Sequence, residues 1–143
     1  MIDHIWSIVC QHSILDRDTN LLSIINVIEE LTIKEQPEPE KSLGIVLELT
    51  SLWVRSDFNV PGQGFARYVF ASPSGQSIKE IEVDIDLTKF ERLRSRGQFI
   101  GLSLLESGRY NFRVEFRENK EEEWKQISSI PIKVNFIPDN LQE

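Results

Sequence analysis

The sequence predicts an all-β fold in which about seven to eight strands form an antiparallel sandwich of two sheets. Two observations lead to this prediction: apolar and polar residues alternate along several segments, and short polar turns separate those segments. Alternation places the apolar side chains of a strand on one face, which can then pack against a second sheet. The 143 residues suffice for one such domain, and we assign residues 1–143 to it.

The N-terminal part is predicted to contain a hairpin. Residues 5–14 form a first apolar segment, residues 16–20 are a polar break, and residues 21–31 form a second apolar segment. In this second segment apolar residues recur at helical spacing behind Asn20, which is in position to cap a helix. Its Ile and Val content fits a strand equally well. We favour the strand, because it would pair with the first segment across the turn.

The middle of the chain is predicted to hold a loop and further strands. Residues 34–42 contain two prolines among charged residues, which excludes a central strand and predicts a surface loop. Apolar residues then line one side of a long strand over residues 43–53, and Tyr68 and Phe70 mark another. Residues 88–97 show no clear alternation, and they fit a short helix or a loop.

The second half shows the clearest strands. Alternation is unbroken over residues 80–87, 109–117 and 132–136. Pro and Gly within residues 72–75 predict a tight turn between two strands. The charged residues 118–123 are expected to form the tip of a hairpin.

A motif over residues 104–110 indicates which kind of β-sandwich the chain forms. Its spacing is Leu-x-acid-x-Gly-x-Tyr, which resembles the tyrosine corner of immunoglobulin-like sandwiches. There the Tyr hydroxyl bonds to the backbone a few residues upstream, and here Tyr110 would do so. Antibody-type domains carry Cys two residues later, where this chain has Phe112. We therefore expect the wider immunoglobulin-like class, with an ordinary hairpin turn as the alternative.

Several short segments carry a resemblance to a known family. They are residues 8–10, 16–23, 27–29, 72–75 and 108–114. In them the chain resembles a family of small bacterial proteins of unknown function, and the resemblance spans most of its length. It implies an immunoglobulin-like β-sandwich, but it implies no activity and no functional residues.

Composition excludes some classes of function. Sixteen Lys and Arg stand against 23 Asp and Glu, and the net charge of −7 makes general nucleic-acid binding unlikely to be the role of this chain. The single cysteine, Cys10, cannot form an intrachain disulfide, which fits a reducing compartment. The sequence shows no signal-peptide pattern and no apolar run that could span a bilayer. We expect a cytoplasmic protein without a membrane partner.

Side chains with the capacity for chemistry are few. Cys10 and His12 share a strand face, but a zinc site needs three or four ligands and no second cluster exists. Asp16, Asp18 and Asn20 imitate the start of a calcium loop, although the later Gly and Glu of that loop are missing. The sequence therefore predicts no catalytic residue, no cofactor and no metal site.

Charged residues on two predicted strands form the candidate interaction surface. Its residues, together with one tryptophan, are Glu80, Glu82, Asp84, Asp86, Arg109, Arg113, Arg117 and Trp124. If the two strands pair, the acidic and basic stripes neutralise each other. Otherwise one stripe is a docking surface for a charged partner. Four further cations, within residues 89–96, are expected to lie in a solvated loop.

These observations favour a non-enzymatic module that binds an unidentified protein partner. The alternative is a ligand-binding module, which would stack a glycan on Trp124 or hold a divalent cation at Asp16, Asp18 and Asn20. An enzyme that uses Cys10 and His12 is the third hypothesis. A sandwich also has edge strands with unpaired backbone groups, through which this chain could form a homo-oligomer.

Overall fold

The computed structural model describes residues 1–33 and 46–137, which form nine strands in two sheets and contain no helix. This confirms the predicted all-β sandwich, whereas the predicted number of seven to eight strands is too low. The expected loop over residues 34–42 lies outside the described residues. No helix able to span a bilayer occurs in the described ranges.

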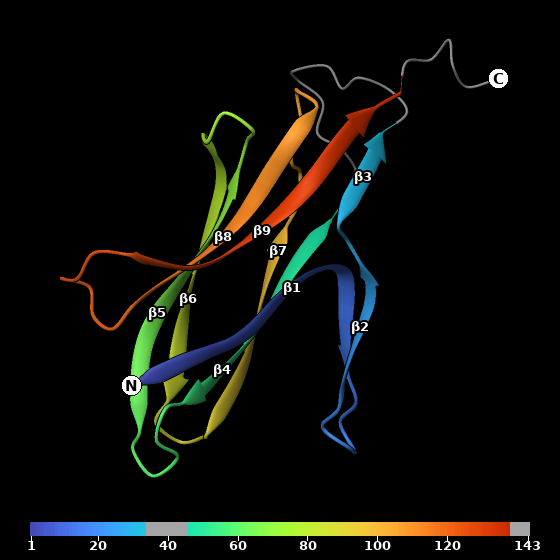
Figure 1. Cartoon of the computed structure of the whole chain (residues 1–143). Coiled ribbons are helices and arrows are strands. Elements are labelled where there is room, and N and C mark those ends of the chain that lie inside the picture. The colour runs from blue at the N-terminus through green and yellow to red at the C-terminus, as the bar shows by residue number, and fades with distance from the viewer. Residues whose placement is uncertain (34–45, 138–143) are drawn as a thin grey trace.

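The two sheets lie one above the other as two layers (Figure 1). The four-stranded sheet has the order β2-β1-β4-β7. Its strands are β1 (Ile2–Leu15), β2 (Leu22–Val27), β4 (Leu47–Arg55) and β7 (Arg92–Phe99). The five-stranded sheet has the order β3-β9-β8-β5-β6. Its strands are β3 (Glu30–Ile33), β5 (Gly62–Ala71), β6 (Ser77–Leu87), β8 (Gly108–Arg117) and β9 (Lys125–Phe136).

Strand pairing corrects the prediction of a wholly antiparallel sandwich. β3 pairs with β9 in parallel, while the other pairs are antiparallel. The cause is a break at residues 28–29, where the chain leaves β2 and crosses to the other sheet. Residues 21–31 are thus not a helix. The favoured strand is confirmed over residues 22–27, since β2 pairs with β1 across the turn at residues 16–20, whereas residues 30–31 begin a separate strand in the other sheet.

Residues 88–97 also differ from the prediction, because most of them belong to strand β7 rather than to a helix or a loop. The inward side of β7 holds the small residues Ser95 and Gly97. Because neither is a large apolar residue, the alternation typical of a strand cannot be recognised in the sequence of this segment. A methyl group on Gly97 would lie 3.1 Å from the Tyr68 ring, so the packing requires a small residue there. The expected solvated basic loop is therefore largely a strand.

The core lies between the sheets and is rich in aromatic side chains. Phe70, Phe99, Tyr110 and Phe112 form one cluster, with ring centroids 4.6 to 6.3 Å apart. Such pairs stabilise a fold beyond the area that they bury. Trp53 packs further along the core, where its indole nitrogen donates to the Ser95 hydroxyl at 3.2 Å. The contacts of Phe99 on β7 with Phe70 and Phe112 join the two layers.

The motif over residues 104–110 makes the expected corner contact. The Tyr110 hydroxyl donates to the Glu106 carbonyl oxygen at 2.7 Å. Gly108 between them has φ 138°, a backbone conformation that side chains disfavour. The chain thereby turns sharply into β8.

Replacing Tyr110 by phenylalanine is expected to lower the free energy of unfolding by about 0.5–1.5 kcal/mol, because it removes one buried hydrogen bond and keeps the ring. Urea denaturation monitored by tryptophan fluorescence measures the difference. Replacing the exposed Glu106 by glutamine keeps its backbone carbonyl and serves as the control. Equal stability of wild type and Y110F would show that the corner hydrogen bond does not stabilise the fold.

The first strand extends beyond the sheet. Residues Ile2 to Cys10 pair with β4, whereas the last residues of β1 pair with β2. Figure 1 shows β1 bending sharply, so that its end and β2 project as a two-stranded hairpin. We call residues 11–27 the arm. Its exposed apolar side chains are Ile14, Leu15, Leu21 and Val27, each 46 to 65% exposed.

Candidate functional site

The eight residues of the predicted interaction surface belong to one side of the five-stranded sheet. The acids on β6 alternate with the apolar residues that pack toward the core, and so do the arginines on β8. Trp124 precedes β9 and reaches the same side through its contacts with Arg67 and Arg117. The structure therefore brings together two stripes that lie about 30 residues apart in the chain.

The two strands that carry these stripes do not pair with each other. Strand β5 lies between β6 and β8, so the acidic and basic residues are not neighbours. Arg67 on β5 links the two sides instead: its Nε donates to Glu115 Oε1 at 2.8 Å, and its Nη1 lies 3.9 Å from Glu80 Oε2. Sequence reasoning missed Arg67, although its position between the core residues Ala66 and Tyr68 was a usable signal.

Two arginines contact the ring of Trp124, which is partly exposed. The Arg117 and Arg67 guanidinium carbons lie 4.1 and 4.8 Å from its ring centroid. Both distances fall within the range of cation–π contacts. A sugar would have to displace a guanidinium from any ring face that an arginine occupies, which weakens the glycan hypothesis.

Buried polar groups surround Cys10 at the root of the arm. Its sulfur donates to Glu48 Oε2 at 3.6 Å, and the Thr50 hydroxyl donates to the same oxygen at 2.7 Å. The Arg96 guanidinium lies within 3.4 Å of the Ser13 hydroxyl and carbonyl oxygens. This cluster ties the arm to strands β4 and β7.

Burial is the main cause that raises the pKa of the Cys10 thiol, to about 11, and the nearby Glu48 carboxylate adds to it. For Glu48 itself, burial alone would raise the pKa. Hydrogen bonds from Ser13, Thr50 and Cys10, with the charge of Arg96, outweigh burial and hold the pKa of Glu48 below its usual range. Glu48 therefore stays ionised, and Cys10 stays a neutral thiol.

The Cys10 thiol is expected to resist alkylation in the folded protein. At pH 8 a thiol with a pKa of about 11 is ionised in about one molecule in a thousand, and Cys10 is fully buried. Mass spectrometry after iodoacetamide treatment should show modification only once urea is added. Rapid modification of the native chain would instead revive the hypothesis of a reactive Cys10.

Polar groups of the turn at residues 16–20 form hydrogen bonds within the turn itself. Asp16 Oδ1 accepts hydrogen bonds from the backbone amides of Asp18 and Thr19 at 2.9 and 3.2 Å. Asn20 adopts the left-handed backbone conformation, with φ 57°, that Asn tolerates in turns. Across residues 1–33 and 46–137, no three His, Cys, Asp or Glu side chains gather as a metal-ligand set.

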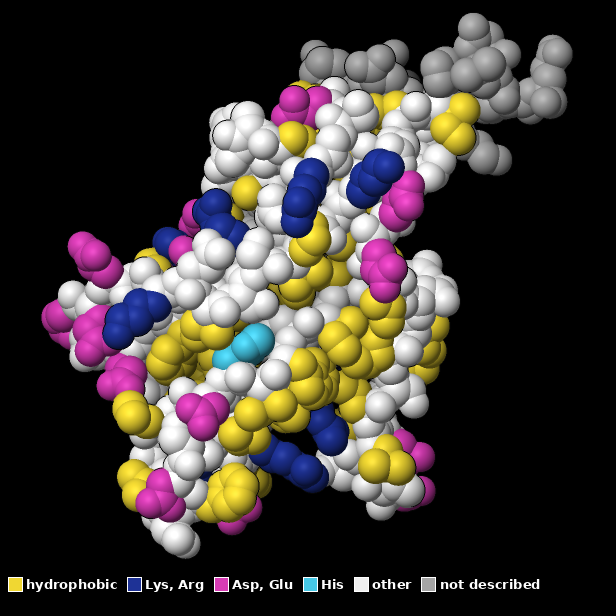
Figure 2. All heavy atoms as spheres, viewed as in Figure 1, with side chains coloured by type: hydrophobic (Ala, Val, Ile, Leu, Met, Phe, Trp, Pro, Cys, Tyr) yellow, Lys and Arg dark blue, Asp and Glu magenta, His cyan; other side chains and the backbone are white. Residues whose placement is uncertain are grey.

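A concave surface lies on the outer face of the four-stranded sheet. It is a hollow of about 1000 Å³ between the arm and the four-stranded sheet. Figure 2 shows hydrophobic side chains gathered around a recess that also holds Lys and Arg side chains. We call this site the hollow. Its lining residues are Ile5, Leu15, Asn20, Leu52, Val54, Phe58, Lys89, Phe90, Glu91, Arg92, Leu93 and Arg94.

The hollow combines exposed apolar side chains with positive charge. Ile5, Phe58 and Phe90 are each more than half exposed around it. Three cations and one carboxylate line it, in a chain whose net charge is −7. Within the described part of the chain, neither Arg92 nor Arg94 forms a salt bridge or a side-chain hydrogen bond. These two cations are available to a ligand.

Comparisons with known proteins add no relative. No model of a known protein family matches the chain, and a search of curated proteins finds no significant match. The resemblance to a bacterial family therefore stays a prediction.

Proposed function

We propose that the chain is an immunoglobulin-like sandwich. The order β9-β8-β5-β6 corresponds to strands G, F, C and C′ of that fold, and β4-β7 corresponds to B and E. The hydrogen bond between Tyr110 and Glu106 supports this reading, since Tyr110 lies at the start of the strand that corresponds to F. The arm is then an addition outside strand A.

We further propose that this domain is a non-enzymatic, cytoplasmic protein-interaction module that holds its partner in the hollow. The observation that carries this proposal is the coincidence, at one concave surface, of exposed apolar side chains with two arginines that form no ion pair with any residue the structure describes. Exposed apolar surface of this kind marks binding sites in soluble proteins. The charged surface around Trp124 is the weaker candidate, because Arg67 and Arg117 are already engaged with neighbouring groups.

Affinity capture with the full chain tests this role. We expect that a partner protein retained by the wild type is lost on changing Arg92 and Arg94 to glutamate. Reversal of Arg109 and Arg113, which changes the charge equally on the other sheet, is the matched control and should retain the partner. Loss of the partner only in the control would place binding on the charged surface instead. Equal recovery with all three chains would rule out both surfaces.

The ligand-binding alternative has less support, because guanidinium groups cover Trp124 and backbone amides occupy an Asp16 oxygen. A thermal-shift screen against sugars and Ca²⁺ distinguishes it, since a ligand of the folded state raises the melting temperature. Self-association through an edge strand also stays a prediction.

A further inference from the structure

We propose that the hollow receives an extended segment of a partner protein in which apolar and acidic residues alternate. The inference rests on the proposed protein-binding role and adds the chemistry of the partner. It follows from how strands β4 and β7 arrange the floor of the hollow.

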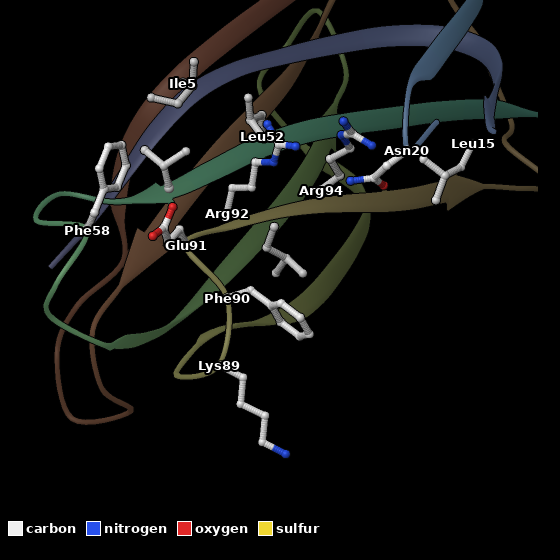
Figure 3. A pocket seen from close by; sticks show the side chains of 12 residues that line it. Ile5, Leu15, Asn20, Leu52, Phe58, Lys89, Phe90, Glu91, Arg92 and Arg94 are labelled. Carbon is white, nitrogen blue, oxygen red and sulfur yellow. The ribbon is translucent and has the colours of Figure 1, made fainter. Parts of the chain in front are cut away.

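The floor consists of two parallel rows of side chains. Strand pairing places Leu52 opposite Arg94 and Val54 opposite Arg92. Residues opposite each other in a sheet share a face, so an apolar row on β4 runs beside a cationic row on β7. Figure 3 shows the Arg92 and Arg94 side chains on the same side of β7, whereas the Lys89 side chain extends away from them.

The spacing of these rows matches an extended peptide. Alternate residues of a strand are about 6.7 Å apart, since each residue rises by about 3.3–3.4 Å. A partner segment that lies along the floor would point successive side chains to opposite sides. Carboxylates at every second position would then meet Arg92 and Arg94 in turn, while the intervening apolar side chains face Leu52 and Val54.

The walls and the charge favour the same occupant. Ile5 and Phe58 bound the hollow beside the apolar row, and Leu15 and Asn20 of the arm bound its other part. A segment with two carboxylates offers each arginine a partner of its own, whereas a single-headed anion such as a fatty acid has one carboxylate for both arginines to share. Arg92 and Arg94 can each form charge-assisted hydrogen bonds with a carboxylate.

Synthetic peptides with a fluorescent label test this inference. A peptide of Leu-Glu repeats should bind the full chain, and binding should weaken at least about tenfold with R92E/R94E, as loss of two charge-assisted contacts implies. The R109E/R113E chain should bind like the wild type. Circular dichroism and thermal unfolding establish that both variants are folded.

Two further peptides and one lipid probe separate the alternatives. Peptides of Leu-Lys and Ser-Glu repeats should each bind at least about tenfold more weakly than Leu-Glu. Equal binding of Leu-Lys, equal binding of Ser-Glu, or binding of dodecanoate alone would overturn the inference. If no peptide binds, but the R92E/R94E chain still fails to retain a partner that the wild type captures, the proposed alternating segment is wrong. The proposed protein-binding role of the hollow would then still hold.

Discussion

Replacing Trp53 by alanine is expected to lower the free energy of unfolding by about 3–5 kcal/mol. The side chain is fully buried, and its ring packs against His4 and Phe116 with centroids 5.0 and 5.5 Å away. Alanine would leave a large cavity between the sheets and remove the hydrogen bond to Ser95. Because domains are typically stable by about 5–15 kcal/mol, this one change would remove much of the total.

Urea denaturation followed by circular dichroism measures this loss. Trp124→Ala is the matched control, since it removes the same side chain from a half-exposed position, and it should have a much smaller effect. A loss below about 1 kcal/mol for W53A would contradict the assignment of Trp53 to a tightly packed core.

Replacing Glu48 by glutamine is the second change with a large expected effect, about 1–3 kcal/mol at pH 7. The Glu48 carboxylate accepts hydrogen bonds from Cys10 and Thr50 inside the cluster at the root of the arm. Glutamine keeps the shape and one acceptor oxygen, but its amide nitrogen cannot accept a hydrogen bond and it lacks the charge that interacts with Arg96, so the hydrogen bonds from Ser13, Thr50 and Cys10 cannot all be kept.

The pH dependence of stability identifies the carboxylate as the cause. Since the folded protein holds the pKa of Glu48 below its unfolded value, the ionised group stabilises the fold above the unfolded pKa. That contribution is lost as the pH falls through the lower, folded pKa. We therefore expect the stability difference between wild type and E48Q to shrink in acid, below about pH 4. A difference that stays constant from neutral to acidic pH would contradict this account.

Strands with a strict alternation could be predicted from the sequence. Residues 80–87 and 109–117 have an apolar face and a charged face, and both are strands with the predicted inward residues. Strand β7 was missed because its inward side uses Ser95 and Gly97, whose small size is explained only by Tyr68 across the core. The parallel pairing of β3 was missed because β3 has only four residues, too few to show a pattern.

The candidate sites, like the strands, could be predicted from the sequence only in part. Residue parity sufficed to place the acids and the arginines on the outside of a sheet, but the strand order decided that β5 separates them. The hollow could not be predicted, because its lining comes from three separate parts of the chain: Ile5 and Leu15 of β1, Leu52 of β4, and Phe90 before β7. Only the bend in β1 brings the arm opposite the β4–β7 surface.

The position of β6 at the border of its sheet gives its acidic row a role in solubility. An edge strand presents unpaired backbone N–H and C=O groups. The same strand of a second copy could pair with them and join the two sheets, which is a route to aggregation. Two copies of β6 placed side by side would bring Glu82 and Asp84 of each against like charges. The acids would therefore help to keep the chain dispersed at high concentration, whatever it binds elsewhere.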